Sequence, residues 1–216
     1  MVIFLKFNEI KNMLPPSSFK YSFNPKKIGI YYIEVILDKI IEDCSYLFSY
    51  CNNILNIDLS SFDTKNVNDM SYMFFGCSRL QSIDLSSFDT KNVTNMRNLF
   101  AACISLKSID LSFFNIKNVI NMREMFIFCF SLYKINLPQF DTKNLPKMNG
   151  MFFACENLKN LDLSSSFDKK TISDMYTWNK YEEEISKENE DREGEFFFLL
   201  TEFLLSLTLM LNNSKS

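Results

Sequence analysis

The stretch SIDLSSFDTKNVTNM, residues 82–96, is a near copy of NIDLSSFDTKNVNDM, residues 56–70. Repetition decides the architecture of a chain, because a unit that recurs folds the same way each time and stacks on its neighbours. Five cysteines recur at intervals of 26 residues: Cys51, Cys77, Cys103, Cys129 and Cys155. Columns with the same period hold leucine (Leu80, Leu106, Leu132, Leu158), methionine (Met70, Met96, Met122, Met148), phenylalanine (Phe74, Phe100, Phe126, Phe152) and asparagine (Asn66, Asn92, Asn118, Asn144).

Each unit combines two hydrophobic periodicities. In LQSIDLSSF, residues 80–88, Ile83 and Leu85 alternate with polar residues, which predicts a strand with one buried face. In NVTNMRNLFAAC, residues 92–103, apolar residues recur at the three-and-four spacing of a helix face. Asn92 stands where a helix N-cap belongs. We therefore expect α/β units, in which a strand is followed by a short helix or a tight helical turn.

Units of this size cannot bury an apolar face alone, so we expect them to stack into a repeat solenoid. Parallel strands stack about 4.8 Å apart, whereas packed helices need about 8–10 Å. This mismatch predicts parallel strands on a concave face and short helices on a convex face, unless the second segments are short enough to flatten the arc.

The predicted solenoid covers residues 28–178, with a degenerate first unit at 28–51 and five units from about residue 52, the last of them degenerate. Residues 1–27 are expected to be a partly disordered or capping segment, and the charged residues 179–195 a linker or a solvated helix.

Residues 196–216 form a hydrophobic C-terminal segment whose role is open. As a helix, the apolar residues 196–211 would span roughly 24 Å, short of the ~30 Å core of a bilayer, and Glu202 adds a further cost. Three interpretations stay open: a helix that covers the end of the solenoid, a short membrane anchor, or a tail that is not genuine coding sequence.

Composition weighs against several classes of function. Histidine is absent, which removes the commonest general base and transition-metal ligand. The four glycines form no phosphate-binding loop, and a net charge of −3 gives no argument for nucleic acid. We therefore expect no enzyme activity, no cofactor and no nucleic-acid partner. The apolar run at residues 2–5 is too short for a secretory signal, which favours a cytoplasmic location.

The repeated pattern C-x-x-L-x-x-I-D-L-S-x-F-D-T-x-N-V-x-x-M-x-x-M-F, over residues 54–175, resembles the BspA-like branch of leucine-rich repeat proteins. That group has a 26-residue unit and includes surface proteins of mycoplasmas, other bacteria and some protists. The resemblance implies a leucine-rich-repeat solenoid without known catalytic activity, and a role in adhesion or protein binding. It also suggests the cell surface, so the location stays open.

The cysteine column predicts buried side chains. Ligands of a structural zinc site usually come in C-x-x-C pairs, but here each unit supplies one cysteine. We therefore expect small buried hydrophobes and no metal site.

An acidic column is the predicted binding site. Because Ile83 and Leu85 face the core, Asp84 must face away. Neighbouring carboxylates about 5 Å apart repel by about 1–3 kcal/mol. Hydrogen bonds from the flanking Ser82 and Ser86 columns, shared calcium or a basic partner could offset this repulsion. The predicted stripe on the concave face consists of Glu34, Asp58, Asp84, Asp110, Asn136 and Asp162.

This stripe predicts a non-enzymatic module that holds a protein or glycan partner, with a basic patch on the partner as one possibility. The alternative is an intracellular structural or scaffolding repeat protein, or a fragment of a longer repeat array.

Overall fold

The computed structural model describes residues 2–7, 31–36, 41–52, 54–141, 145–158, 161, 163 and 166–177. The chain divides into two units, Met1–Trp178 and Asn179–Ser216, and every described residue belongs to the first. The predicted linker at 179–195 and the hydrophobic segment at 196–216 lie outside the described residues.

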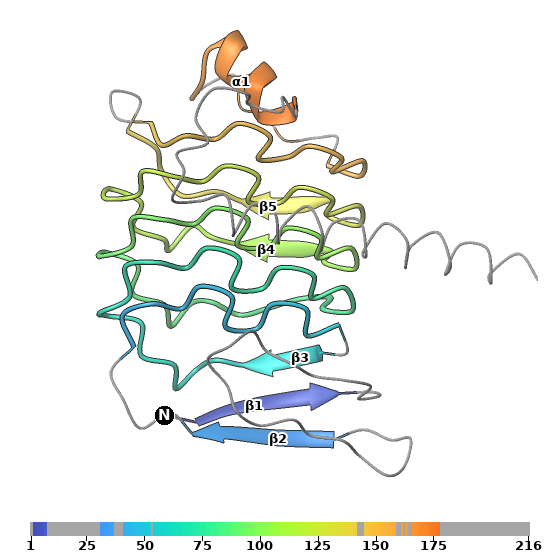
Figure 1. Ribbon diagram of the computed structural model, residues 1–216. Coiled ribbons are helices and arrows are strands. Elements are labelled where there is room, and N and C mark those ends of the chain that lie inside the picture. The colour runs from blue at the N-terminus through green and yellow to red at the C-terminus, as the bar shows by residue number, and fades with distance from the viewer. Residues whose placement is uncertain are drawn as a thin grey trace, which may run out of the picture. The chain divides into compact units, whose positions relative to one another are not determined.

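Successive 26-residue turns of chain lie one above the other (Figure 1). We call them the first to fourth coils: residues 52–77, 78–103, 104–129 and 130–155. Strands β3 (Ile54–Asp58), β4 (Ser108–Asp110) and β5 (Lys134–Asn136) occupy the predicted strand position in the first, third and fourth coils. β4 and β5 pair in parallel, with Ile109 opposite Ile135. The fold is therefore a repeating α/β arrangement, as predicted in outline.

The N-terminal end differs from the prediction. β1 (Val2–Phe7) lies between β2 (Tyr31–Ile36) and β3, and it pairs antiparallel with both. The prediction that β2 lies directly beside β3, as the strand of a degenerate unit, is therefore wrong. A terminal strand exposes unpaired backbone groups, and β1 supplies partners for them. Because β1 matches no repeat column, the periodicity could not place it.

Of the two predicted forms of the second segment, the short helix is wrong, and the coils contain tight turns instead. In residues 70–77, alternate N–H groups donate to the next coil, for example Met70 N to Asn95 O at 2.9 Å and Tyr72 N to Arg97 O at 2.9 Å. The N–H groups between them close tight turns, as Met73 N does on Met70 O at 3.3 Å. An α-helix instead bonds every N–H to the carbonyl four residues back.

Left-handed residues explain why these segments do not coil into helices. Two positions per coil have a φ between 55° and 69°, a region that interrupts a right-handed helix. The first position holds Tyr46, Tyr72, Asn98, Glu124 and Gly150, and the second holds Tyr50, Gly76, Ala102, Phe128 and Ala154.

Backbone hydrogen bonds therefore join the coils on the turn side as well as the strand side. Parallel bridges link Asp43 to Asp69, Asp69 to Asn95, Asn95 to Asn121 and Asn121 to Lys147. The prediction of a concave and a convex face assumed packed helices on one side. Within the described coils that mismatch in spacing is absent.

The one helix of the described residues, α1 (Lys169–Tyr176), follows the last coil. Asp168 caps it by accepting a hydrogen bond from Thr171 N at 2.7 Å. The carbonyl oxygens of Asp174 and Met175 accept from Gly150 N and Phe152 N of the fourth coil, each at 2.8 Å. α1 thus satisfies backbone donors that a further coil would otherwise satisfy.

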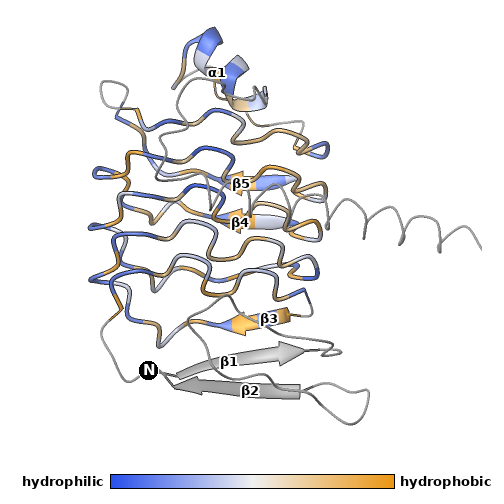
Figure 2. Ribbon diagram, viewed as in Figure 1, coloured by the Kyte–Doolittle hydropathy of each residue, from blue (hydrophilic) through white to orange (hydrophobic). Residues whose placement is uncertain are grey.

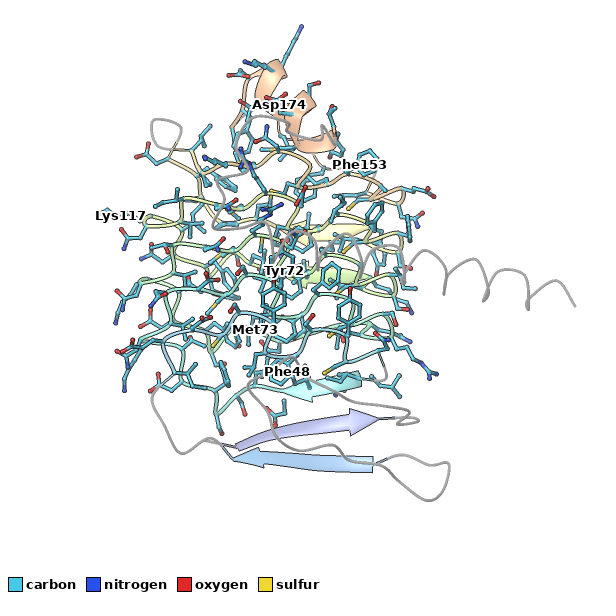
Figure 3. All side chains as sticks on the ribbon, viewed as in Figure 1. Phe48, Tyr72, Met73, Lys117, Phe153 and Asp174 are labelled. Carbon is cyan, nitrogen blue, oxygen red and sulfur yellow. The ribbon has the colours of Figure 1, made fainter. Side chains whose placement is uncertain are left out.

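The core consists of side-chain columns that run through the coils. Apolar and polar segments alternate along each coil (Figure 2), and Phe48 and Met73 lie inside while Lys117 projects outward (Figure 3). One column is a phenylalanine stack with centroid separations of 5.3–5.9 Å: Phe48, Phe74, Phe100, Phe126 and Phe152. Such offset-stacked pairs add to the free energy of burial.

Candidate functional site

Four residues of the predicted stripe lie together on the exposed strand side: Asp58, Asp84, Asp110 and Asn136. Glu34 does not neighbour Asp58, because β1 separates the two strands and Phe4 pairs with both residues. The side chain of Glu34 and the residue Asp162 lie outside the described residues. We call the four residues the acidic row.

Each carboxylate of the acidic row closes a small turn within its own coil. Asp58 accepts a hydrogen bond from Ser60 N, and Asp84 accepts one from Ser86 N, both at 2.9 Å. Asp110 accepts from Ser112 N at 2.9 Å and from the Ser112 hydroxyl at 2.6 Å. Of the two serine columns that flank the row, the one on the C-terminal side of each aspartate therefore donates to the carboxylate. This is the usual hydrogen bond of an Asx-turn.

These hydrogen bonds outweigh the repulsion between neighbouring carboxylates. The backbone and side chain of Ser86 lower the pKa of Asp84, although the charge of Asp58 opposes them. Ser60 likewise lowers the pKa of Asp58. Hydrogen bonding to the charged form favours ionisation. The three aspartates of the row are therefore ionised at neutral pH, and the hydrogen bonds of their own turns favour the charged form.

The acidic row ends in the fourth coil. Asn136 replaces the aspartate, and its Nδ2 donates to Oδ2 of Asp110 at 2.9 Å. The Ser112 hydroxyl, the Ser112 N–H and Asn136 lower the pKa of Asp110, with a smaller contribution from the charge of Lys134. No ion pair of the described residues includes Asp58 or Asp84. The uncompensated negative charge therefore lies in the first and second coils.

The structure contains two further columns of the same turn. Asp63 and Asp89 accept from Lys65 N and Lys91 N, and each pairs with the same lysine's Nζ at 2.9 Å. The other column is Asp43, Asp69, Asn95 and Asn121, each accepting from the N–H two residues on. The recurring D-x-S and D-x-K spacings in the sequence indicate these turns. Asn95 and Asn121 accept the same hydrogen bond, so asparagine can replace aspartate in the turn.

The asparagine column has a different role from the predicted one. Asn92 Nδ2 donates to Lys65 O, and Asn118 Nδ2 donates to Lys91 O, both at 2.7 Å. The N-cap prediction is wrong because no helix follows these residues. Their amides instead connect one coil to the coil before it.

The prediction that the cysteine side chains are buried is confirmed. All six cysteines are free and buried, at 0–7% exposure. Four thiols donate to carbonyls of the preceding coil at 3.1–3.2 Å: Cys77, Cys103, Cys129 and Cys155, to Phe48, Phe74, Phe100 and Phe126 respectively. Burial raises the pKa of Cys103 well above its usual value. A buried protonated thiol is a poor nucleophile.

The described residues lack the features of two other types of site. No group of three or more cysteine, aspartate and glutamate side chains in the described ranges could hold a metal ion. No helix in the same part of the chain has the length and apolar character needed to cross a membrane. The segment 196–211 lies outside the residues to which this finding applies.

Comparison with known proteins identifies the family. A family model described as "Mycoplasma protein of unknown function, DUF285" matches residues 42–166 and again residues 105–191. Two overlapping matches are the expected result for a chain whose units resemble one another. Neither the curated proteins nor the solved structures gave a match. The two matches together cover more than half of the chain, which therefore belongs to the mycoplasma DUF285 family.

Proposed function

We propose that the chain is a non-enzymatic binding module, a solenoid of the BspA-like leucine-rich repeat type that holds a protein partner on its acidic row. The observation that supports this function is the row itself: one exposed, ionised carboxylate from each of three successive coils, at Asp58, Asp84 and Asp110.

The partner presents a basic surface. Strands that pair side by side are about 4.8 Å apart, so a lysine or arginine side chain of the partner can contact two carboxylates of the row at once. Asp58 and Asp84 have no ion pair among the described residues, so a basic partner displaces no internal cation from them. A glycan is the less favoured partner, because the positions two residues before the members of the row hold Asn56, Ser82, Ser108 and Lys134 and no aromatic ring, although Phe113 and Tyr133 are exposed nearby in the sequence.

A structural or scaffolding role inside the cell is the second candidate. It is favoured by the six free thiols, since proteins of oxidising compartments commonly form disulfides whereas intracellular thiols stay reduced. In that role the exposed aspartates close their turns and bind nothing.

Replacing aspartate by asparagine tests the binding function cleanly. Asn95 and Asn121 show that an asparagine oxygen still accepts the turn hydrogen bond. The triple variant Asp58→Asn, Asp84→Asn, Asp110→Asn therefore loses charge and keeps the turns. A matched control, Asp63→Asn with Asp89→Asn, removes charge from a neighbouring column.

The measurement is capture of partners by the full chain, and the thermal melt of each variant. The binding function predicts that the triple variant loses capture, that the control variant keeps it, and that raised salt weakens it. Equal capture by all three proteins would exclude the acidic row as the binding surface. A chain that captures no partner in any form favours the scaffolding role.

A further inference from the structure

Asn149 and Gly150 form the one Asn-Gly dipeptide of the sequence. In such a pair the backbone nitrogen of the glycine can attack the side-chain amide of the asparagine, because glycine has no Cβ to hinder the approach. The first three coils have no such dipeptide at the equivalent positions, which hold Ser71-Tyr72, Arg97-Asn98 and Arg123-Glu124. The fourth coil therefore holds a chemically labile pair that its neighbours lack.

The reaction at this pair is deamidation. The Gly150 nitrogen loses its proton and forms a bond to Cγ of Asn149, while the bond from Cγ to the side-chain nitrogen breaks and that nitrogen takes up a proton and leaves as ammonia. Water then opens the resulting cyclic imide at either of its two carbonyl carbons. One opening gives aspartate, and the other gives isoaspartate. Water is the only other reactant, so the reaction needs no enzyme and no cofactor.

The Gly150 nitrogen is hydrogen-bonded in the folded chain, because its N–H donates to Asp174 O of α1 at 2.8 Å. In the second coil the equivalent N–H donates to the next coil instead, from Asn98 N to Arg123 O at 3.0 Å. Asn149 O accepts from Glu124 N at 3.0 Å, so the Asn149–Gly150 peptide group is held at both its N–H and its carbonyl. The bond to α1 must therefore break before the nitrogen can attack.

The helix α1 covers Gly150 where a further coil would cover it in the middle of the stack. Its eight residues are too few for a helix that is stable alone in water. It is held by the bonds from Gly150 N and Phe152 N, by the buried side chain of Met175, and by a ring contact between Phe152 and Tyr176 with centroids 5.7 Å apart. Opening of so small an element costs less than global unfolding. Gly150 N–H is therefore released by a local event.

We propose that Asn149 is a site of spontaneous deamidation that α1 controls. The helix protects the Asn149–Gly150 peptide group while it is docked on the fourth coil, and the reaction proceeds when the helix leaves. The rate of deamidation in the folded chain is then the rate in the unfolded chain multiplied by the fraction of molecules in which α1 is open. A tenfold protection corresponds to about 1.4 kcal/mol for the opening of α1.

The two products differ in their effect on the fold. Asn149 Oδ1 lies 3.5 Å from Nε of Arg123, so the carboxylate of an aspartate product faces a guanidinium and is accommodated. In the isoaspartate product the Gly150 nitrogen is bonded to Cγ of residue 149 and no longer to the main-chain carbonyl carbon. The N–H is thereby displaced from its position opposite Asp174 O. Isoaspartate therefore weakens the docking of α1, whereas aspartate preserves it.

Mass spectrometry of the full chain, incubated folded in buffer or unfolded in urea at the same mildly alkaline pH, measures the fraction deamidated at Asn149. Hydrogen exchange of Gly150 N–H reports the opening of α1 independently. Asp168→Ala removes the cap of α1, and Met175→Ser removes its buried side chain. Ser173→Ala, at an exposed position of the same helix, is the matched control.

We expect the folded native chain and Ser173→Ala to deamidate at least about tenfold more slowly than the unfolded chain. Asp168→Ala should raise the rate in the folded chain about fivefold, which is the equivalent of the ~1 kcal/mol that a lost cap costs. Met175→Ser should raise it further, and if that variant does not fold, Asp168→Ala decides the outcome. Equal rates in the folded and unfolded native chain would overturn the inference. So would a folded variant whose Gly150 N–H exchanges faster while Asn149 deamidates no faster.

Discussion

Alkaline pH should unfold this protein through its buried thiols. Cys77, Cys103 and Cys129 are fully buried, and burial raises the pKa of each well above the ordinary value of 9.0. In the unfolded chain the same thiols ionise near that ordinary value. A group whose pKa is raised on folding contributes stability that is complete below its unfolded pKa and is lost as the pH rises toward its folded pKa.

The magnitude follows from proton linkage. Above about pH 9 the folded state holds one more proton per buried thiol than the unfolded state, which costs about 1.4 kcal/mol of unfolding free energy per pH unit. Three thiols lose roughly 4 kcal/mol by about pH 10. A domain of this kind has roughly 5–15 kcal/mol in total, so the loss is a large fraction of it.

Urea unfolding under reducing conditions, at a series of pH values from about 7 to about 10, measures this loss. The variant Cys103→Ala is the control. It is less stable at neutral pH, because it leaves a cavity and loses the hydrogen bond to Phe74 O, but its pH slope is shallower by about 1.4 kcal/mol per unit. An unchanged slope in Cys103→Ala, or rapid modification of native Cys77 by a bulky thiol reagent, would refute the buried-thiol explanation.

Three further predictions concern the core, a buried hydroxyl and the acidic row. Phe100→Ala should cost about 3–5 kcal/mol in chemical denaturation, because Phe100 is fully buried between two stacked rings; a cost under about 1 kcal/mol would contradict the packing. Thr90→Val should cost about 1–3 kcal/mol, since Thr90 Oγ1 donates to Asn115 O and accepts from Asn115 N, whereas Thr94→Val, at an exposed site, should cost less. Asp84→Asn should slightly lower the neutral-pH melting temperature and weaken its fall below about pH 4, because the lowered pKa of Asp84 contributes stability that is present at neutral pH and is lost as the pH falls through it; an identical acid profile would contradict this.

The repeat columns predicted the inward side chains better than the backbone that carries them. Met70, Met73, Phe74 and Cys77 face the core at the spacing of a helix. That spacing also arises in a chain of tight turns, provided that every fourth residue or so is left-handed. Gly76 and Gly150 hold two of the left-handed positions, but the others are not glycines, as at Tyr72 and Asn98, so the repeat carried no consistent signal for that conformation. The hydrophobic pattern therefore could not distinguish the two backbones.

The sequence predicted the members of the acidic row that lie in regular repeats, but it misplaced Glu34, which lies outside them. Alternation with Ile57 and Leu85 placed Asp58 and Asp84 on the exposed side. Glu34 fell in the same column by spacing alone, but strand pairing with β1 is a contact between segments far apart in sequence, which periodicity does not reveal. The sequence left several groups that could offset the repulsion between the carboxylates. In the structure, the hydrogen bond from Ser86 N to Asp84 is one that does so.

The backbone hydrogen bonds between coils, here called the backbone ladder, allow the number of coils to change in evolution. Because the ladder needs no particular side chain, unequal recombination between repeats can add or remove a whole coil and leave each remaining backbone bond with an equivalent partner. Outward positions can then diverge coil by coil, as Lys134 and Asn136 have done in the fourth coil. The exception is the junction of the second and third coils, where Arg97 Nη2 lies 3.1 Å from Glu124 Oε2, because a coil without these charges inserted there would separate the guanidinium from the carboxylate. Natural length variants of this family should therefore avoid that junction unless they also lose both charges.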